Sequence, residues 1–588
     1  MNKKTIYLIG ILIVSGCAIY FFNLHNSLFW DDEDWILNNQ AVHSLSWANV
    51  KFWFIHNTLA GIGLKSNYYR PFLFFTFALN YIISGAKPLG YHLVSNLIHI
   101  ANGVLLFFLL RRLFKRDNLS FLVALIFLIH PIQTEAVSYV SGRGDLLVTM
   151  FMFVSLWLFI NSWEAKRKVL YYGFSVISLI FALLSRETAI IFPLLALLVY
   201  VLFGSSDRIG TSLKKGFLRT WPYFVVVFSY GILRLTVLNF LDTLNFYIQP
   251  NIYSEHLFVR LVTFLDILLT YGRLLLIPVG LHMERSNEVF TSIFQWPAWL
   301  VLISLIALIY LLYKFYIISR KDFAKASEFK VLAFGILWFF IGLGPVSGIT
   351  PINSLIYEHW LYLPMIGFWV IICFYLTKLF EHLKSKKLII YRLLLVAIVT
   401  CYLLFFGYQA IKRNILWGNA EAFYKDILKY EPDSGRINNN LGNLYFNKGD
   451  NVNAENYYKV AIQTADTFPQ SHFNYGSILE AKKDIYGAIQ EYKRAIEIDP
   501  NFYYAYQNLV VLYAKNGDLA NAIIYIEGLK RLLPENPRVY YNAALLYMTS
   551  NNKNLAIQNL NEGLKYLYLD PESKPLFDNI QKQIQRTK

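Results

Sequence analysis

The chain has 588 residues, of which 56% are hydrophobic and 17% aromatic, whereas only 16% are charged. An average soluble domain carries roughly 25% charged residues, so a chain this apolar must place much of its surface against lipid. The three cysteines stand singly in apolar stretches, which excludes a disulfide framework. The net charge of +16 arises within residues 1–417, which hold 35 basic and 19 acidic residues, because residues 418–588 hold 19 of each. Basic charge confined to the apolar part is typical of membrane topology and argues against a nucleic-acid partner.

Apolar segments long enough to cross a bilayer recur through the first 417 residues. The first follows Lys3 and Lys4, and no small-residue cleavage site comes after it, which predicts an uncleaved span with a cytoplasmic N-terminus. Two further apolar stretches, 71–84 and 258–280, are predicted as interfacial or re-entrant helices on the outer face. The predicted spans lie near 5–24, 90–110, 118–133, 146–162, 169–184, 188–203, 221–240, 297–318, 331–346, 361–380 and 388–411.

These eleven spans put the residues after Trp417 outside the cytoplasm. The loops support this orientation, because basic clusters such as 111–116, 166–168 and 320–330 then fall on the inner side. The compact loops and the Lys-, Asn- and Ile-rich composition favour a bacterial inner membrane, with an ER membrane as the alternative.

A repeat of 34 residues begins after Trp417. It is carried by two columns of residues, Asp450, Asp484, Asp518 and Asn552, and Ala454, Ala488, Ala522 and Ala556. This period is typical of tetratricopeptide (TPR) repeats, in which paired helices stack into a solenoid. We therefore expect an all-α chain with a membrane domain over 1–417, a TPR solenoid over 418–571 and a C-terminal tail over 572–588.

A third column of the repeat is polar and consists of Asn440, Asn474, Asn508 and Asn542. It falls on the first helix of each repeat, which lines the concave groove of such solenoids. An asparagine amide can both donate to and accept from a peptide backbone without reading its side chains. The column predicts a groove for an acceptor peptide; the alternative is that these residues only cap or solvate each repeat.

Four consecutive acidic residues, Asp31 to Asp34, follow the first predicted span and are flanked by aromatic residues. Adjacent carboxylates at a bilayer edge repel one another and are costly to desolvate, so we favour a function over a solvated loop or a helix cap. A serine or threonine hydroxyl is a poor nucleophile that needs such a carboxylate as a base. We therefore predict Asp31 and Asp32 as catalytic residues.

Other charged residues fall on the same predicted face, in separate loops. They are Arg70, Glu135, Arg143, Asp145, Arg186, Glu187, Glu358 and His359. Each alone fits a snorkelling side chain or a structural ion pair. Together they predict one cleft that joins a base to a cationic site for a leaving phosphate.

Several short motifs carry a resemblance to a known family. They are "DD" after the first span, "YRP" at 69–71, "HL-x-x-N-L-x-H" at 92–99, "HPIQTEAV…GRGDLL" at 130–147 and "LLSRE" at 183–187. Together with the TPR array, this set resembles the transmembrane and TPR-containing protein O-mannosyltransferases. The chain departs from that pattern at Glu358-His359-Trp360, where Glu-Arg-Tyr is expected, and at Gly144-Asp145, where Ala-Glu is more usual.

The resemblance implies a GT-C fold and an enzyme that takes a sugar from a polyprenyl- or dolichyl-phosphate carrier. It also implies an acidic base in the first outer loop and inversion at the sugar in a single displacement. The expected partners are this donor, an acceptor protein or peptide in the TPR groove, and the bilayer. No cofactor is certain, and a divalent metal between carboxylates and phosphate fits the chemistry without being demanded by the spacing.

Two other functions remain open from the sequence. One is a polymerase or ligase that acts on lipid-linked oligosaccharide, and the other is a non-catalytic membrane scaffold that carries TPR repeats. The scaffold is the weakest reading, because an anchor needs only one or two spans and does not concentrate carboxylates at one membrane face. A transporter would instead place its ionisable residues near the middle of the membrane.

Overall fold

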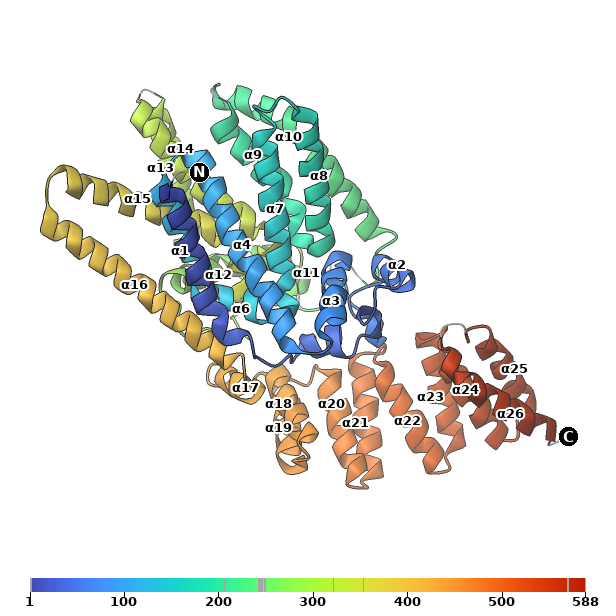
Figure 1. Cartoon of the computed structure of the whole chain (residues 1–588). Coiled ribbons are helices and arrows are strands. Elements are labelled where there is room, and N and C mark those ends of the chain that lie inside the picture. The colour runs from blue at the N-terminus through green and yellow to red at the C-terminus, as the bar shows by residue number, and fades with distance from the viewer. Residues whose placement is uncertain are drawn as a thin grey trace. The chain divides into compact units, whose positions relative to one another are not determined.

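The structure is a computed structural model that describes residues 3–205, 207–241, 247, 250–320, 322–352, 354–567 and 570–586. The chain divides into two compact units, Met1–Phe423 and Tyr424–Lys588. Their described residues form helices joined by turns and loops, without a strand (Figure 1). The predicted all-α class is confirmed.

Within its described ranges, the first unit contains sixteen α-helices and the start of α17. They are α1 Lys3–Tyr20, α2 Trp47–Ile55, α3 Pro71–Ser84, α4 Pro88–Phe114, α5 Asp117–Ile129, α6 Thr134–Ser138, α7 Arg143–Asn161, α8 Lys168–Ser185, α9 Phe192–Val199, α10 Ile209–Leu235, α11 Ile252–Glu255, α12 Leu257–Leu276, α13 Ala298–Ser319, α14 Phe323–Leu343, α15 Met365–Ser385, α16 Ile389–Leu416 and α17 Ala420–Leu428.

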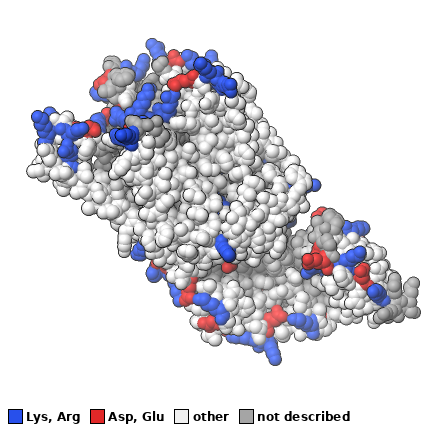
Figure 2. All heavy atoms as spheres, in the orientation of Figure 1, with Lys and Arg blue, Asp and Glu red and all other residues white. Residues whose placement is uncertain are grey.

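Nine helical segments among the described residues are long and apolar enough to cross a membrane. A tenth is formed if the bent pair Asp117–Ile129 and Pro131–Ser138 is counted as one span. The chain is therefore an integral membrane protein. Figure 2 shows Lys and Arg gathered at the end of the first unit where α1 begins, above a broad and almost uncharged surface band. This asymmetry is the pattern that the positive-inside rule uses to orient spans.

One predicted span, 221–240, does not qualify by length and composition. Helix α10 covers only 221–235 of it and begins earlier, and Lys214, Lys215 and Arg219 dilute the apolar character of its first half. The two stretches predicted as interfacial or re-entrant, 71–84 and 258–280, do not qualify either. Helix α3 has only 14 residues, which is too short to cross a bilayer, and α12 has 20 residues with Arg260, Asp266 and Arg273 along it. The estimate of eleven spans is therefore approximate.

A sharp bend after α5 turns the chain into the interior of the unit. Pro131 follows His130 and cannot donate the next helical hydrogen bond, and the two helical segments on either side meet at 52°. The imidazole of His130 fixes the turn, because its Nδ1 accepts from Ile132 N at 3.2 Å and its Nε2 lies 3.0 Å from Leu275 O. The bend places Glu135, on α6, in the buried interior.

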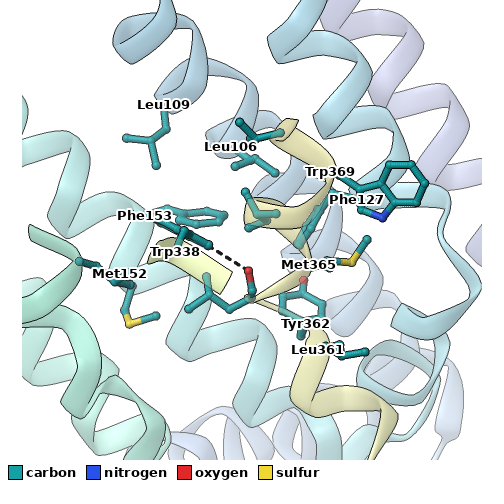
Figure 3. Packing of buried hydrophobic residues seen from close by; sticks show 14 of the residues in the cluster. Leu106, Leu109, Phe127, Met152, Phe153, Trp338, Leu361, Tyr362, Met365 and Trp369 are labelled. Atoms are coloured by element: carbon teal, nitrogen blue, oxygen red, sulfur yellow. Dashed lines mark hydrogen bonds between the residues drawn. The ribbon is translucent and has the colours of Figure 1, made fainter. Parts of the chain in front are cut away.

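The core of the first unit lies where α4, α5, α7, α14 and α15 meet, and Figure 3 shows part of it. Trp338 and Trp369 are its largest side chains and are almost fully buried. The indole Nε1 of Trp338 donates to Leu363 O at 3.1 Å. This bond ties α14 to the short segment η10 (Glu358–Leu361) and the turn after it, so the core also positions the loop that contains His359.

The second unit consists of paired antiparallel helices. They are α18 Gly435–Asn447, α19 Asn451–Thr464, α20 Pro469–Ala481, α21 Ile485–Ile498, α22 Tyr503–Lys515, α23 Leu519–Leu532, α24 Pro537–Thr549, α25 Lys553–Leu564 and α26 Lys574–Arg586. The four alanines of the repeat are fully buried between paired helices. The Asp/Asn column at 450, 484, 518 and 552 has a different structural role. Each of these side chains accepts a hydrogen bond from a backbone N–H and so caps the N-terminus of the second helix of its repeat.

The segment after the last repeat, predicted as a tail, contains helix α26. Phe577 and Ile580 of this helix pack against Ala544 and Leu560 of the preceding pair. A solenoid needs a polar outer cap on its last exposed apolar face, and α26 supplies one.

Candidate functional site

The carboxylate of Asp32 is buried and held by the loop that precedes α7. Its Oδ1 accepts from Ser141 N at 2.7 Å and from Ser141 Oγ at 2.6 Å, and its Oδ2 accepts from Val140 N at 3.4 Å. The side chain is only 2% exposed, and no cation in the described part of the chain forms an ion pair with it. The carboxylate is thus fixed by neutral donors.

The loop that holds Asp32 depends on a close backbone approach. A Cβ at Gly142 would lie 3.0 Å from Ala136 O and 3.2 Å from Glu135 O, so a larger residue would push this loop off α6. Gly142 therefore sets the position of the backbone donors at residues 140 and 141.

The electrostatic surroundings make Asp32 an unusually weak acid. The pKa of its carboxyl is raised to about 7, mainly by burial; the hydrogen bonds from Ser141 oppose this rise, and the charge of Asp31 adds to it. Burial also raises the pKa of Asp34. A carboxyl that titrates near neutral pH suits general acid–base work.

Arg143 lies in the same motif and serves the scaffold. Its guanidinium is fully buried and donates to Asn80 Oδ1 at 2.7 Å, Tyr91 O at 2.9 Å and Ser95 Oγ at 3.2 Å. It also stacks on Phe77, with 4.9 Å from Cζ to the ring centroid. Its donors join α3, α4 and α7, and none of these partners is an anion.

Four residues predicted for the cleft form one continuous chain of contacts. Arg186 Nη1 donates to Asp145 Oδ2, and Arg186 Nη2 donates to His359 Nε2 at 3.1 Å. His359 Nδ1 lies 2.6 Å from Glu135 Oε1, and Glu135 Oε2 accepts from the backbone N of residue 358 at 3.1 Å. Segments around 135, 145, 186 and 359 are thereby brought together, as the sequence predicts.

The contacts of His359 define its protonation. A guanidinium can only donate, so Nε2 accepts from Arg186 and carries no proton. Nδ1 then carries the proton and donates it to the carboxylate of Glu135. Burial lowers the pKa of His359 to about 3, in agreement with this neutral tautomer. The only cation in the chain of contacts is Arg186.

Glu358 is the centre of a second buried group, which contains two residues that the sequence motifs do not include. Its Oε1 accepts from Arg285 Nη2 at 2.7 Å and from His282 N at 2.6 Å, and its Oε2 lies 3.5 Å from Arg413 Nη2. Burial raises the pKa of Glu358, and the two arginines oppose this rise. Arg413 comes just after the predicted span 388–411, and a basic residue at a span end is the one sequence feature that could have indicated its role. Arg285 has no comparable feature in the sequence.

Arg70 and Glu187 form a separate pair beside the first chain of contacts. Arg70 Nε donates to Glu187 Oε2 at 3.2 Å, and Tyr69 N donates to Glu187 Oε1 at 3.1 Å. The guanidinium of Arg70 also lies 4.5 Å above the ring of Tyr68. The consecutive residues Arg186 and Glu187 therefore connect the short turn before α9 to two different loops.

A small cavity adjoins Asp145 and His359. Its remaining walls are largely apolar and include Met152, Ile191 and Val346, and its volume is about 30 Å³. Ligand pockets usually measure roughly 300–1,000 Å³, so in this conformation the cavity admits water and no sugar.

No group of three or more His, Cys, Asp or Glu side chains arranged to hold a metal ion occurs within the described ranges. The metal that the sequence left open therefore has no ready-made cluster of protein ligands among these residues.

The four asparagines predicted for the TPR groove are all half-buried. Asn474 Nδ2 donates to Asn439 Oδ1 at 2.9 Å and to Asn443 Oδ1 at 2.8 Å, so its amide protons are used between neighbouring repeats. Its Oδ1 remains as an acceptor for an incoming backbone N–H.

Comparison with known proteins identifies both parts of the chain. Residues 70–232 match the family model of dolichyl-phosphate-mannose-protein mannosyltransferases. Residues 417–471, 469–502, 491–524 and 537–566 match models of the tetratricopeptide repeat. The predicted family resemblance is confirmed. The motifs at Arg70, Glu135, Arg143, Asp145 and Arg186 all lie inside the mannosyltransferase match.

Curated relatives align with most of this chain. A protein O-mannosyl-transferase of Caenorhabditis elegans is 27% identical over 75% of this chain and 60% of its own length. Protein O-mannosyl-transferase TMTC4 of Homo sapiens is 26% identical over 75% of this chain and 64% of its own length. The chain thus spans less than two thirds of these relatives. Among solved structures, MamA is 22% identical over 27% of this chain and 94% of its own, with a TM-score of 0.25.

The buried group around Glu358 generates a prediction about stability. Glu358→Gln would leave Arg285 and Arg413 without a counter-charge in the interior, and breaking such a pair costs about 3–5 kcal/mol. We expect a clear drop in the thermal unfolding midpoint of the purified protein in detergent.

The control is Glu328→Gln, which breaks the more exposed pair with Lys378 and should cost at most about 1 kcal/mol. Equal unfolding midpoints for Glu358→Gln and Glu328→Gln would contradict this account of the buried group.

Proposed function

We propose that the protein is a membrane glycosyltransferase that moves a sugar, mannose by its family resemblance, from a polyprenyl-phosphate carrier to serine or threonine hydroxyls of proteins. The observation that carries this proposal is the buried, neutral-donor-bound carboxylate of Asp32 in a chain whose membrane unit matches the mannosyltransferase model. The names of the relatives support a protein acceptor and a mannosyl donor.

Asp32 acts as the base in this proposal. Its Oδ1 is occupied by Ser141, whereas its Oδ2 has only the long contact with Val140 N, so Oδ2 is free to accept the proton of the incoming hydroxyl. As that proton moves to Oδ2, the hydroxyl oxygen bonds to the anomeric carbon. The bond from this carbon to the phosphate oxygen breaks, and the electron pair leaves with the lipid phosphate, which inverts the sugar.

Arg186 receives the leaving phosphate. Two of its N–H groups contact Asp145 and His359, which leaves further donors of the planar fork for phosphate oxygens. Because His359 is neutral, it does not neutralise the positive charge of Arg186 that attracts the phosphate. The apolar slot between Met152, Ile191 and Val346 has the chemistry to receive the first part of the lipid chain once these helices separate.

The acceptor protein binds the TPR groove, and the asparagine column contacts its backbone. The groove is assigned to the same extracytoplasmic side as Asp32, because both follow an odd number of spans in the predicted topology. Backbone recognition of this kind would allow many acceptor sequences to be used.

The first prediction concerns the base. Asp32→Asn keeps the size of the side chain but cannot take a proton, and loss of a general base lowers rates by about 10²–10⁴-fold. The measurement is transfer of radiolabelled mannose from polyprenyl-phosphate mannose to protein in membranes that contain equal amounts of each variant.

Glu33→Gln is the matched control, because Glu33 lies in the same acidic cluster but is exposed. We expect it to keep transfer near the wild-type rate. Near-normal transfer by Asp32→Asn would refute the assigned base, and label in lipid-linked oligosaccharide instead of protein would favour a polymerase or ligase.

The pH dependence follows from the raised pKa of Asp32. Because the base must be ionised, kcat/KM should rise as the pH increases through about 7 and level off above it. Ser141→Ala removes a hydrogen bond that stabilises the carboxylate, so the pKa should increase and the midpoint should move to higher pH. An unchanged or lower midpoint in Ser141→Ala would contradict the assignment.

The TPR groove gives a further prediction. Asn474→Ala combined with Asn508→Ala removes two side chains of the asparagine column. Each hydrogen bond to the acceptor backbone that is lost in this way is worth about 0.5–1.5 kcal/mol. We expect KM for a protein acceptor to rise about tenfold, with little change in transfer to a short soluble acceptor. Asn554→Ala, exposed on α25, is the control. Equal KM values for both variants would remove the column from acceptor binding.

A further inference from the structure

A second, larger cavity lies at the other end of the membrane unit from Asp32. Lys4, at the start of α1, donates to Asn118 Oδ1 at 3.3 Å, which fixes residues 111–118 near the N-terminal end of that helix. Asp32 comes after its C-terminal end, and the 18 residues of α1 span about 27 Å. The cavity walls include residues 112–116, so this basic pocket is separate from the proposed catalytic site.

The basic pocket has a volume of about 340 Å³, large enough for the head group of a small ligand. Its cationic wall is formed by Arg112, Lys115, Arg116 and Lys330, from the ends of α4, α5 and α14. One carboxylate, Glu164, also lines it. The pocket therefore carries a clear excess of positive charge.

Most of this charge has no counter-ion among the residues that the structure describes. Arg112 pairs with Glu164 at 2.5 Å near the exposed rim. Among the described residues, Lys115, Arg116 and Lys330 form no ion pair, and the guanidinium of Arg116 only lies 5.0 Å from the ring centroid of Phe374. Three clustered cations without a partner create a site that attracts an anion.

An indole provides an independent sign of a missing acceptor. Trp163 lines the pocket, and its Nε1 is buried with no hydrogen-bond partner among the described residues. Buried donors are rarely left unpaired, because the loss costs about 1–3 kcal/mol. The unpaired donor and the cations together call for a ligand rich in acceptor oxygens, such as a phosphate.

The remaining walls favour a lipid over a soluble phosphate. Besides the cations the pocket is lined by apolar side chains, among them Phe114, Ile160 and Phe203, at the ends of membrane-spanning helices. A soluble phosphate or nucleotide gains nothing from such walls, whereas the glycerol and the first methylenes of a phospholipid do. Basic pockets between spans are known as sites for anionic head groups.

We propose that the basic pocket binds the phosphate head group of an anionic membrane phospholipid, on the membrane face opposite to Asp32. The bound lipid neutralises Lys115, Arg116 and Lys330 and joins the start of α14 to the ends of α4 and α7. The full chain therefore prefers anionic to zwitterionic bilayers independently of its donor substrate.

The test measures the affinity of full-length protein in neutral detergent for phosphatidylglycerol and for phosphatidylcholine, by native mass spectrometry of retained lipid. Lys115→Gln with Lys330→Gln removes two pocket cations, and Lys384→Gln with Lys386→Gln removes two exposed cations outside the pocket lining, near the end of α15. We expect the first pair to lower affinity for phosphatidylglycerol by about tenfold and the second pair to leave it unchanged.

Trp163→Phe is a second variant that removes the Nε1 donor and keeps an aromatic ring, and it should weaken phosphatidylglycerol retention about threefold while phosphatidylcholine retention stays the same. Equal phosphatidylglycerol affinity in the wild type and the pocket variants would overturn the proposal. So would displacement of the lipid by millimolar inorganic phosphate, which would assign the pocket to a soluble phosphate.

Discussion

Charged side chains buried at the Asp32 end of the spans must be paired or hydrogen-bonded, and this requirement organises the membrane unit. Glu358 is fully buried with Arg285 and Arg413, and Glu135 is fully buried and accepts a hydrogen bond from the neutral imidazole of His359. Removing one member of such a group leaves a charge in a medium that solvates it poorly. Each loop is thus held by residues of other loops, so the Asp32 end of the membrane unit behaves as one structure rather than as separate turns.

The pairing separates two chemical tasks within the proposed mechanism. Asp32 is held by the neutral donors of Ser141 and Val140, and its burial keeps it weakly acidic and able to take a proton. Arg186 is held by Asp145 and by a neutral imidazole, and it keeps donors for an anion. A cation in contact with Asp32 would lower its pKa and make it a poorer base. The absence of such a contact in the described part of the chain suits the proposed role.

The sequence predicted the all-α class, the membrane spans and the TPR repeats because hydropathy and a 34-residue period are local and repeated signals. It also named the segments that meet around Glu135 and Arg186. It could not predict that Arg143 would donate its hydrogen bonds to Asn80, Tyr91 and Ser95, because those partners are distant in the chain and neutral. Arg285 was missed for the same reason. Long-range pairing depends on how the helices pack, and no local pattern records it.

The division between base and phosphate site is tested most directly by measuring the affinity for polyprenyl-phosphate mannose without an acceptor. We expect Asp32→Asn to bind this donor as tightly as the wild type, because Asp32 acts on the hydroxyl. Arg186→Lys keeps the charge but loses the planar fork, and its Kd should rise about tenfold or more while the protein stays folded. Weaker donor binding in Asp32→Asn, with unchanged binding in Arg186→Lys, would contradict the account.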